Sequence, residues 1–183
     1  MDYLTLGKII LATPWLICLS IRDFRKHELP NTWVIGGILV MAAIALGVSG
    51  NYLIGSLVTA FFSALFLLLP FFLRAAGAGD VKMLFAAGLI AGPGNTLNLV
   101  LLVSLAGLVL ACVMLFLRKV DPARIKHFCR CLFDIRYDRA EGRRNLPPPE
   151  TESCRVPFGM AIATGLFLNL LLQLLYSMEV ATW

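Results

Sequence analysis

Two aspartates stand at the ends of long apolar runs in this chain. Asp23 follows the first run, and Asp80 closes the segment "GAGD" just before another run. If such runs cross a membrane, a carboxylate at their edge is costly and is a candidate for function by default. Two carboxylates close together can share a proton, because their repulsion raises the pKa of one of them. The ionised member can then take a proton from water while the protonated member polarises a carbonyl group, which is the chemistry of aspartic proteolysis.

Each aspartate alone also has a simpler interpretation. Asp80 can cap the helix that follows it by accepting a hydrogen bond from an unpaired backbone N–H. Asp23 can be a surface residue paired with a neighbouring arginine or lysine, a contact of little energetic weight. The case for catalysis therefore depends on whether the chain brings the two carboxylates to the same place.

The composition points to a membrane protein. Hydrophobic residues make up 59% of the 183 residues, charged residues only 15%, and the mean hydropathy is +0.83. A soluble domain would hold about 25% charged residues. We expect an all-α polytopic protein that forms a single membrane-embedded domain over residues 1–183. A spanning helix needs about 20 mostly apolar residues, and six stretches come close, the fourth being short: 4–21, 32–49, 52–73, 81–93, 96–117 and 157–178.

The positions of the basic residues predict how the chain is oriented. Of the 16 lysines and arginines, all but Lys8 fall in or at the edge of the first, third and fifth loops between these stretches, and ten of them lie within 118–155. The loops at 47–51 and 91–95 carry no charge. Since cytoplasmic loops attract lysine and arginine, we place the three basic loops in the cytoplasm and both termini outside. The positive charge is thus explained by topology, and a nucleic-acid partner is not expected.

This topology brings the two aspartates to one side of the membrane. Asp23 and Asp80 are separated by two predicted spans, so both lie at the cytoplasmic face. The polar segment at about 118–155 is predicted to be a basic cytoplasmic loop with one short helix near 121–134. Three of the five cysteines fall in this loop without clustered histidines, so neither a metal site nor a disulfide framework is predicted.

Several motifs resemble the type IV prepilin peptidases, polytopic aspartic proteases of the membrane. "GAGD" at 77–80 matches the Gly-Xaa-Gly-Asp motif of that family, and "D…LPN" at 23–31 resembles its first aspartate with the following Pro-Asn. "VPFGMAIATG" at 156–165 resembles the segment that opens the last span, with Met160 where many members have proline. The resemblance implies catalytic roles for Asp23 and Asp80. It also implies that the site is shaped by the motif residues Gly77, Gly79, Lys82, Pro30, Asn31, Pro157 and Gly159.

The resemblance implies an aspartic endopeptidase that removes a short basic leader from prepilins or pseudopilins at the cytoplasmic face of the bacterial inner membrane. It implies no cofactor and no metal, and its partners would be the substrate and membrane lipid. Larger, bifunctional members carry an additional cytoplasmic region with paired Cys-Xaa-Xaa-Cys motifs, linked to N-methylation of the pilin. This chain passes from its first span to Asp23 without that insertion, and its "CRC" at 129–131 has a different place and spacing. It is therefore similar to the short, peptidase-only enzymes of Flp/Tad pilus systems, and methyltransfer is not expected.

Two other classes of function remain open at this level. A small proton-coupled transporter would use the aspartates as a proton pair, but it would be expected to carry ionisable groups nearer the middle of its spans. A non-catalytic subunit of a pilus or secretion assembly would tolerate isosteric changes at both aspartates. The sequence determines neither the particular prepilin substrate nor the oligomeric state.

Overall fold

A computed structural model describes the chain over residues 3–26, 31–72, 76–116 and 158–180. Several predicted features lie outside these ranges, namely Pro30, Pro157, the short helix near 121–134 and the "CRC" segment.

The described residues form six helices, and no strand occurs among them. Each apolar stretch predicted from the sequence contains one helix, because a run of about 18 to 23 apolar residues satisfies its backbone hydrogen bonds internally only as a helix. Two boundaries differ by more than two residues at the ends that face the predicted cytoplasmic side. The first helix continues five residues beyond the predicted end at 21, and the fourth begins three residues before 81. The helices are α1 (Tyr3–Lys26), α2 (Asn31–Val48), α3 (Gly50–Phe72), α4 (Ala78–Ala91), α5 (Thr96–Phe116) and α8 (Phe158–Val180).

Five of these helices are long and apolar enough to cross a membrane, namely α1, α2, α3, α5 and α8. The remaining helix, α4, has 14 residues and is about 21 Å long, against roughly 30 Å for the hydrocarbon core. Its buried residues begin at Met83 and run almost without interruption to Ala91. The short helix is therefore an internal element that the longer helices surround.

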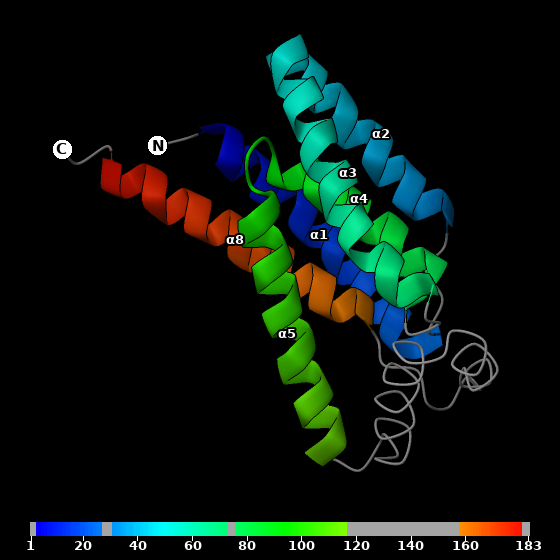
Figure 1. Cartoon of the computed structure of the whole chain (residues 1–183). Coiled ribbons are helices and arrows are strands. Elements are labelled where there is room, and N and C mark those ends of the chain that lie inside the picture. The colour runs from blue at the N-terminus through cyan, green and yellow to red at the C-terminus, as the bar shows by residue number, and fades with distance from the viewer. Residues whose placement is uncertain (1–2, 27–30, 73–75, 117–157, 181–183) are drawn as a thin grey trace, which may run out of the picture.

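Glycines lie where helices pack closely, because no side chain separates the two helix backbones there. A Cβ atom added to Gly88 of α4 would lie 2.5 Å from the Cα of Ala60 in α3. One added to Gly165 of α8 would lie 2.7 Å from the backbone of Val103 in α5. Small residues allow this approach between membrane helices, where van der Waals contact drives association. α3 with α4, and α5 with α8, are the most extensively packed pairs (Figure 1).

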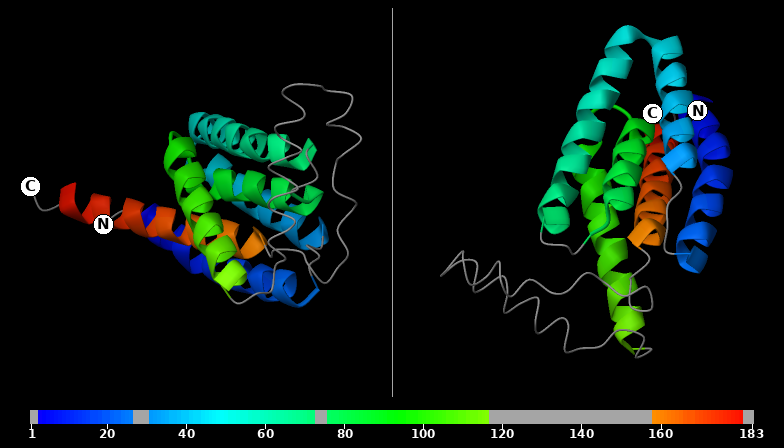
Figure 2. Two further views of the ribbon diagram at one scale, coloured as in Figure 1. Left: turned by 60° about the horizontal axis from the view of Figure 1, so that its bottom comes forward. Right: turned by 90° about the vertical axis from the view of Figure 1, so that its right-hand side faces the viewer.

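The helix ends gather at two opposite sides of the bundle. In the right-hand view of Figure 2, the C-terminal ends of α1, α3 and α5 point downward, as do the N-terminal ends of α4 and α8. The two termini and the α2–α3 turn lie toward the top of that view. The chain thus places the ends that carry Asp23 and Asp80 on one side, as the topology argument predicts.

A buried lysine lies toward the other side. Lys8 of α1 is 5% exposed, and its ammonium group donates a hydrogen bond to the hydroxyl of Tyr52 in α3. Both groups pack on Gly92, which ends α4 with a φ of 88°. A side chain at Gly92 would be strained by this backbone angle and would meet the Tyr52 hydroxyl. The three residues therefore join α1, α3 and α4.

Candidate active site

Asp23 lies in the last turn of α1 and is only 5% exposed. The first turn of α8 covers its carboxyl group through Gly159. A Cβ atom at Gly159 would lie 2.6 Å from Oδ2 of Asp23 and 3.0 Å from its Cγ. The absence of a side chain at position 159 is what allows α8 to approach this carboxyl group. Two of the motifs identified in the sequence, separated by more than 130 residues, are therefore in direct contact.

Asp80 lies in the first turn of α4 and is partly buried. Its Oδ2 accepts a hydrogen bond of 3.0 Å from the backbone N–H of Gly77, the residue that caps the helix. This is the reciprocal contact that a third-position carboxylate makes in a capping box. The helix starts before Asp80, so Asp80 is its third residue and not the cap residue, although its carboxylate accepts the backbone hydrogen bond that the simpler interpretation supposes. The backbone of Gly77 has a φ of −83°, and Gly92 and Gly94 are the only described glycines with positive φ, so "GAGD" needs no left-handed residue.

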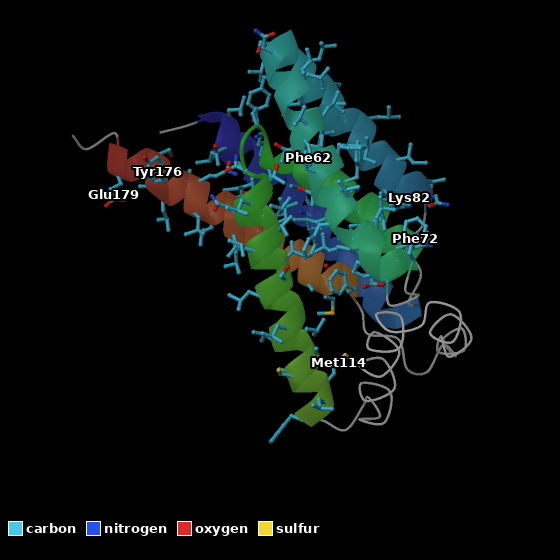
Figure 3. All side chains as sticks on the ribbon, viewed as in Figure 1. Phe62, Phe72, Lys82, Met114, Tyr176 and Glu179 are labelled. Atoms are coloured by element: carbon cyan, nitrogen blue, oxygen red, sulfur yellow. The ribbon has the colours of Figure 1, made fainter. Side chains whose placement is uncertain are left out.

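Lys82 links the second motif to the first. Its Nζ donates a hydrogen bond of 3.0 Å to Oδ1 of Asn31, the first residue of α2. The side chain is exposed, as expected for a lysine at the membrane surface, but it also has a defined protein partner. In the view of Figure 3, Lys82 lies on the side of the bundle away from Glu179.

The packing of whole helices explains why these residues share one end of the bundle. α8 packs against both α1 and α4, the helices that carry the two aspartates, and α2 packs against α4. The first turn of α8 lies on Asp23, while the start of α2 is bonded to the start of α4. The structure thus brings Asp23 together with Gly159, Asp80 with Gly77, and Asn31 with Lys82. Pro30 and Pro157 lie in segments that the structure does not describe.

The arrangement offers carboxylate chemistry from Asp23 and Asp80. Within the residues that the structure describes, no group of three or more histidine, cysteine, aspartate or glutamate side chains is placed to hold a metal ion. The sequence did not reveal that Gly159 touches Asp23 or that Lys82 bonds Asn31. The sequence offered one signal for both contacts, namely that all four residues belong to motifs resembling those of the peptidase family.

Comparison with known proteins identifies a family. Residues 10–112, more than half of the chain, match the model of the type IV leader peptidase family. This region contains both aspartates and the bonded pair Asn31 and Lys82. Comparisons with curated proteins and with solved structures gave no match.

Proposed function

Since the chain belongs to the type IV leader peptidase family, we propose that it is an aspartic endopeptidase that removes the short basic leader from prepilins or prepilin-like proteins. Cleavage would occur at the cytoplasmic face of the bacterial inner membrane. The observation that carries this proposal is the placement of Asp23 and Asp80 at the same end of the bundle, on two helices that both pack against α8.

The proposed mechanism uses the two carboxyl groups as a pair. The ionised carboxylate takes a proton from a water molecule, and the resulting nucleophile attacks the scissile carbonyl. The protonated carboxyl group donates a hydrogen bond to the carbonyl oxygen as negative charge develops on it. The C–N bond then breaks, and the leaving amine takes the proton that the other carboxyl group received from water. The proton shared by the pair titrates as a property of both groups. Gly159 and Gly77 would hold the carboxyl groups in place, because one packs on Asp23 and the other donates to Asp80.

The chain fits the short form of such an enzyme. α1 continues without interruption from Tyr3 past Asp23 to Lys26, so no cysteine-bearing insertion separates the first helix from the first aspartate. The activity we propose is therefore proteolysis alone, as in the Flp/Tad-type enzymes that the sequence resembles. The buried Asp23 and the partly buried Asp80 lie at one edge of the helix bundle, where the peptide bond between a polar leader and an apolar helix would also lie.

The test is cleavage of a prepilin by the purified protein in proteoliposomes, followed by mass measurement of the product. The intact protein should release a leader of one defined length. Asp23→Asn and Asp80→Asn should each abolish cleavage, since asparagine cannot take a proton from water or share one with its partner.

The Asp80→Asn variant also separates catalysis from capping. An asparagine side chain can still accept the hydrogen bond from Gly77 N–H, so a purely structural Asp80 predicts nearly normal activity. Processing at the normal rate by this variant, at equal abundance in the membrane, would refute the protease proposal. A non-catalytic assembly subunit would give no cleavage with the unmodified protein either.

A further inference from the structure

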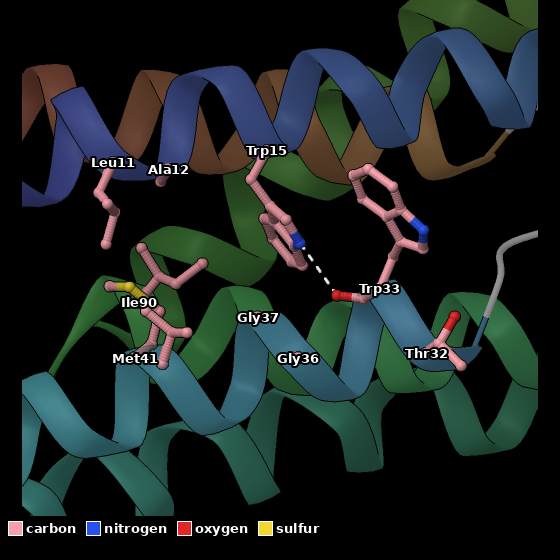
Figure 4. A pocket seen from close by; sticks show the side chains of 10 residues that line it. Leu11, Ala12, Trp15, Thr32, Trp33, Gly36, Gly37, Met41 and Ile90 are labelled. Carbon is pink, nitrogen blue, oxygen red and sulfur yellow. Dashed lines mark hydrogen bonds between the residues drawn. The ribbon is translucent and has the colours of Figure 1, made fainter.

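An apolar groove runs along the membrane-embedded face between α1 and α2. It has a cavity volume of about 440 Å³ and is floored by Ile90 of α4. Figure 4 shows Leu11 and Met41 at one end, and Thr32 and Trp33 at the other. From Thr32 to Met41 the groove follows ten residues of α2, and the nine rises between them amount to about 14 Å.

Two adjacent glycines give the groove its shape, and they differ in what covers them. The indole ring of Trp15 fills the space above Gly37, where an added Cβ atom would lie 2.4 Å from the ring. The Trp15 indole also donates a hydrogen bond of 3.0 Å to the backbone carbonyl of Trp33, which fixes the ring in place (Figure 4). At Gly36, nothing lies within 4 Å of an added Cβ atom. The groove therefore exposes bare backbone at Gly36, the feature that allows a second helix to approach closely.

One end of this groove adjoins the candidate active site. Thr32 and Trp33 line that end, and the preceding residue, Asn31, is bonded to Lys82, two residues after Asp80. A second apolar groove lies on the other side of α1, against α8. On that side of α1 the carboxyl group of Asp23 is covered, because the first turn of α8 packs on it through Gly159. The groove between α1 and α2 is therefore the one that ends beside the contact between Asn31 and Lys82, close in sequence to Asp80.

We propose that the groove between α1 and α2 binds the start of the apolar helix that follows the leader in the substrate. This inference rests on the proposed peptidase function. A helix seated against Gly36 would place its N-terminal end beside Asn31 and Lys82, and the bond before the helix would then lie at the level of Asp80. The length of the groove matches about the first nine residues of such a helix.

The first test fills the groove without disturbing the protein. Gly36→Leu adds a side chain where nothing stands within 4 Å. We expect this variant to raise KM for a membrane-embedded prepilin at least about tenfold with little change in kcat, because it blocks binding and not chemistry. Gly47→Leu is the matched control, since position 47 is on the same helix, equally open and beyond the groove. Thr164→Leu fills the groove against α8 instead, and both controls should retain the normal KM.

The second test locates the substrate directly. A photo-crosslinking amino acid is placed at Val40 in the proposed groove or at Phe167 in the groove against α8, in an Asp23→Asn background. Val40 lies nine residues from Asn31, so it should crosslink to about the ninth residue of the substrate helix, and Phe167 should not crosslink to the substrate. Equal KM values for Gly36→Leu and Gly47→Leu, with crosslinks from Val40 to lipid alone, would show that lipid fills the groove and would overturn the proposal. Absence of cleavage by the unmodified protein would instead refute the peptidase function.

Discussion

At the scale of single residues, glycines determine how the two carboxyl groups are held. Gly159 has no side chain, and this allows the backbone of α8 to lie on Asp23. Gly77 uses its backbone N–H to hold Asp80 Oδ2 at 3.0 Å. Asp23 is held by packing from a distant helix, whereas Asp80 is held by a hydrogen bond within its own turn. Substitutions near Asp23 should therefore change the position of its carboxyl group by changing how α8 packs on α1.

Gly159→Ala should lower the rate of cleavage strongly. The added Cβ atom would lie 2.6 Å from Oδ2 of Asp23, so either the carboxyl group or the start of α8 must move. A displacement of about 1 Å at a catalytic group costs on the order of 100-fold in rate. The measurement is kcat for prepilin cleavage, with membrane insertion checked separately. Gly7→Ala on α1 is the control, because its Cβ atom would meet nothing within 4 Å and its rate should be unchanged. A normal rate for Gly159→Ala would show that the Asp23 carboxyl group can be displaced without cost.

At the scale of helices, α8 and α4 organise the site. α8 contacts both aspartate-bearing helices, and α4 is buried between the longer helices. The bond between Lys82 and Asn31 fixes the start of α4 relative to the start of α2. α2 forms one wall of the groove and Ile90 of α4 also lines it, so the groove is joined to the helix that carries Asp80 both by packing and by this hydrogen bond.

The contact between Lys82 and Asn31 should appear as coupling in a double-mutant cycle. A hydrogen bond at an exposed site contributes about 0.5–1 kcal/mol, so Lys82→Met and Asn31→Ala should each lower kcat/KM about two- to fivefold. The double variant should be no worse than either single variant, because both remove the same bond. Independent, additive losses would mean that the two side chains act separately in the enzyme.

Gly88→Ala should destabilise the protein through the packing of α3 on α4. Its Cβ atom would lie 2.5 Å from the Cα of Ala60, and a backbone atom cannot turn aside as a side-chain end can. Overpacking of this kind costs about 1–3 kcal/mol. Thermal unfolding in detergent should show a lower midpoint for Gly88→Ala than for Gly47→Ala, where the added methyl group meets nothing. Equal midpoints would show that α3 and α4 can move apart at this point without loss of stability.

At the scale of the whole molecule, the charge pattern predicts one orientation, and the structure bears on its single exception, Lys8. Lys8 was the single basic residue that the positive-inside pattern did not explain. The structure shows why it does not conflict, since its ammonium group is buried against Tyr52 and is not part of a loop. The positive-inside rule counts lysines in loops, so a lysine buried within the helix bundle does not determine on which side its segment lies.

We predict that residues 50 and 94 are external and that residues 120–150 are cytoplasmic. The measurement uses single cysteines introduced into a cysteine-free variant and a reagent that does not cross the membrane. In intact cells the reagent should label positions 50 and 94, and it should label positions 120–150 only after the membrane is opened. Labelling of an introduced cysteine between 120 and 150 in intact cells would reverse the orientation and place both aspartates outside.

The sequence alone predicted the helices and the shared side of the aspartates. Runs of about 20 apolar residues leave the backbone few alternatives in a bilayer, so all six ranges were found as helices. The short fourth run gave a helix too short to be counted among the spans, and its start before Asp80 was missed. Helix boundaries depend on capping contacts, and here the cap is a glycine without a side-chain signal.

Only the tertiary structure decided which residues meet. Three contacts join positions that are 44 or more residues apart. They are the packing of Gly159 on Asp23 and the hydrogen bonds from Lys82 to Asn31 and from Lys8 to Tyr52. Hydropathy predicts that a segment forms a helix, but it does not predict which face of the helix contacts a neighbouring helix. In lipid nearly every face is apolar, so that choice depends on small residues and a few polar contacts, and these take effect only when the helices are assembled.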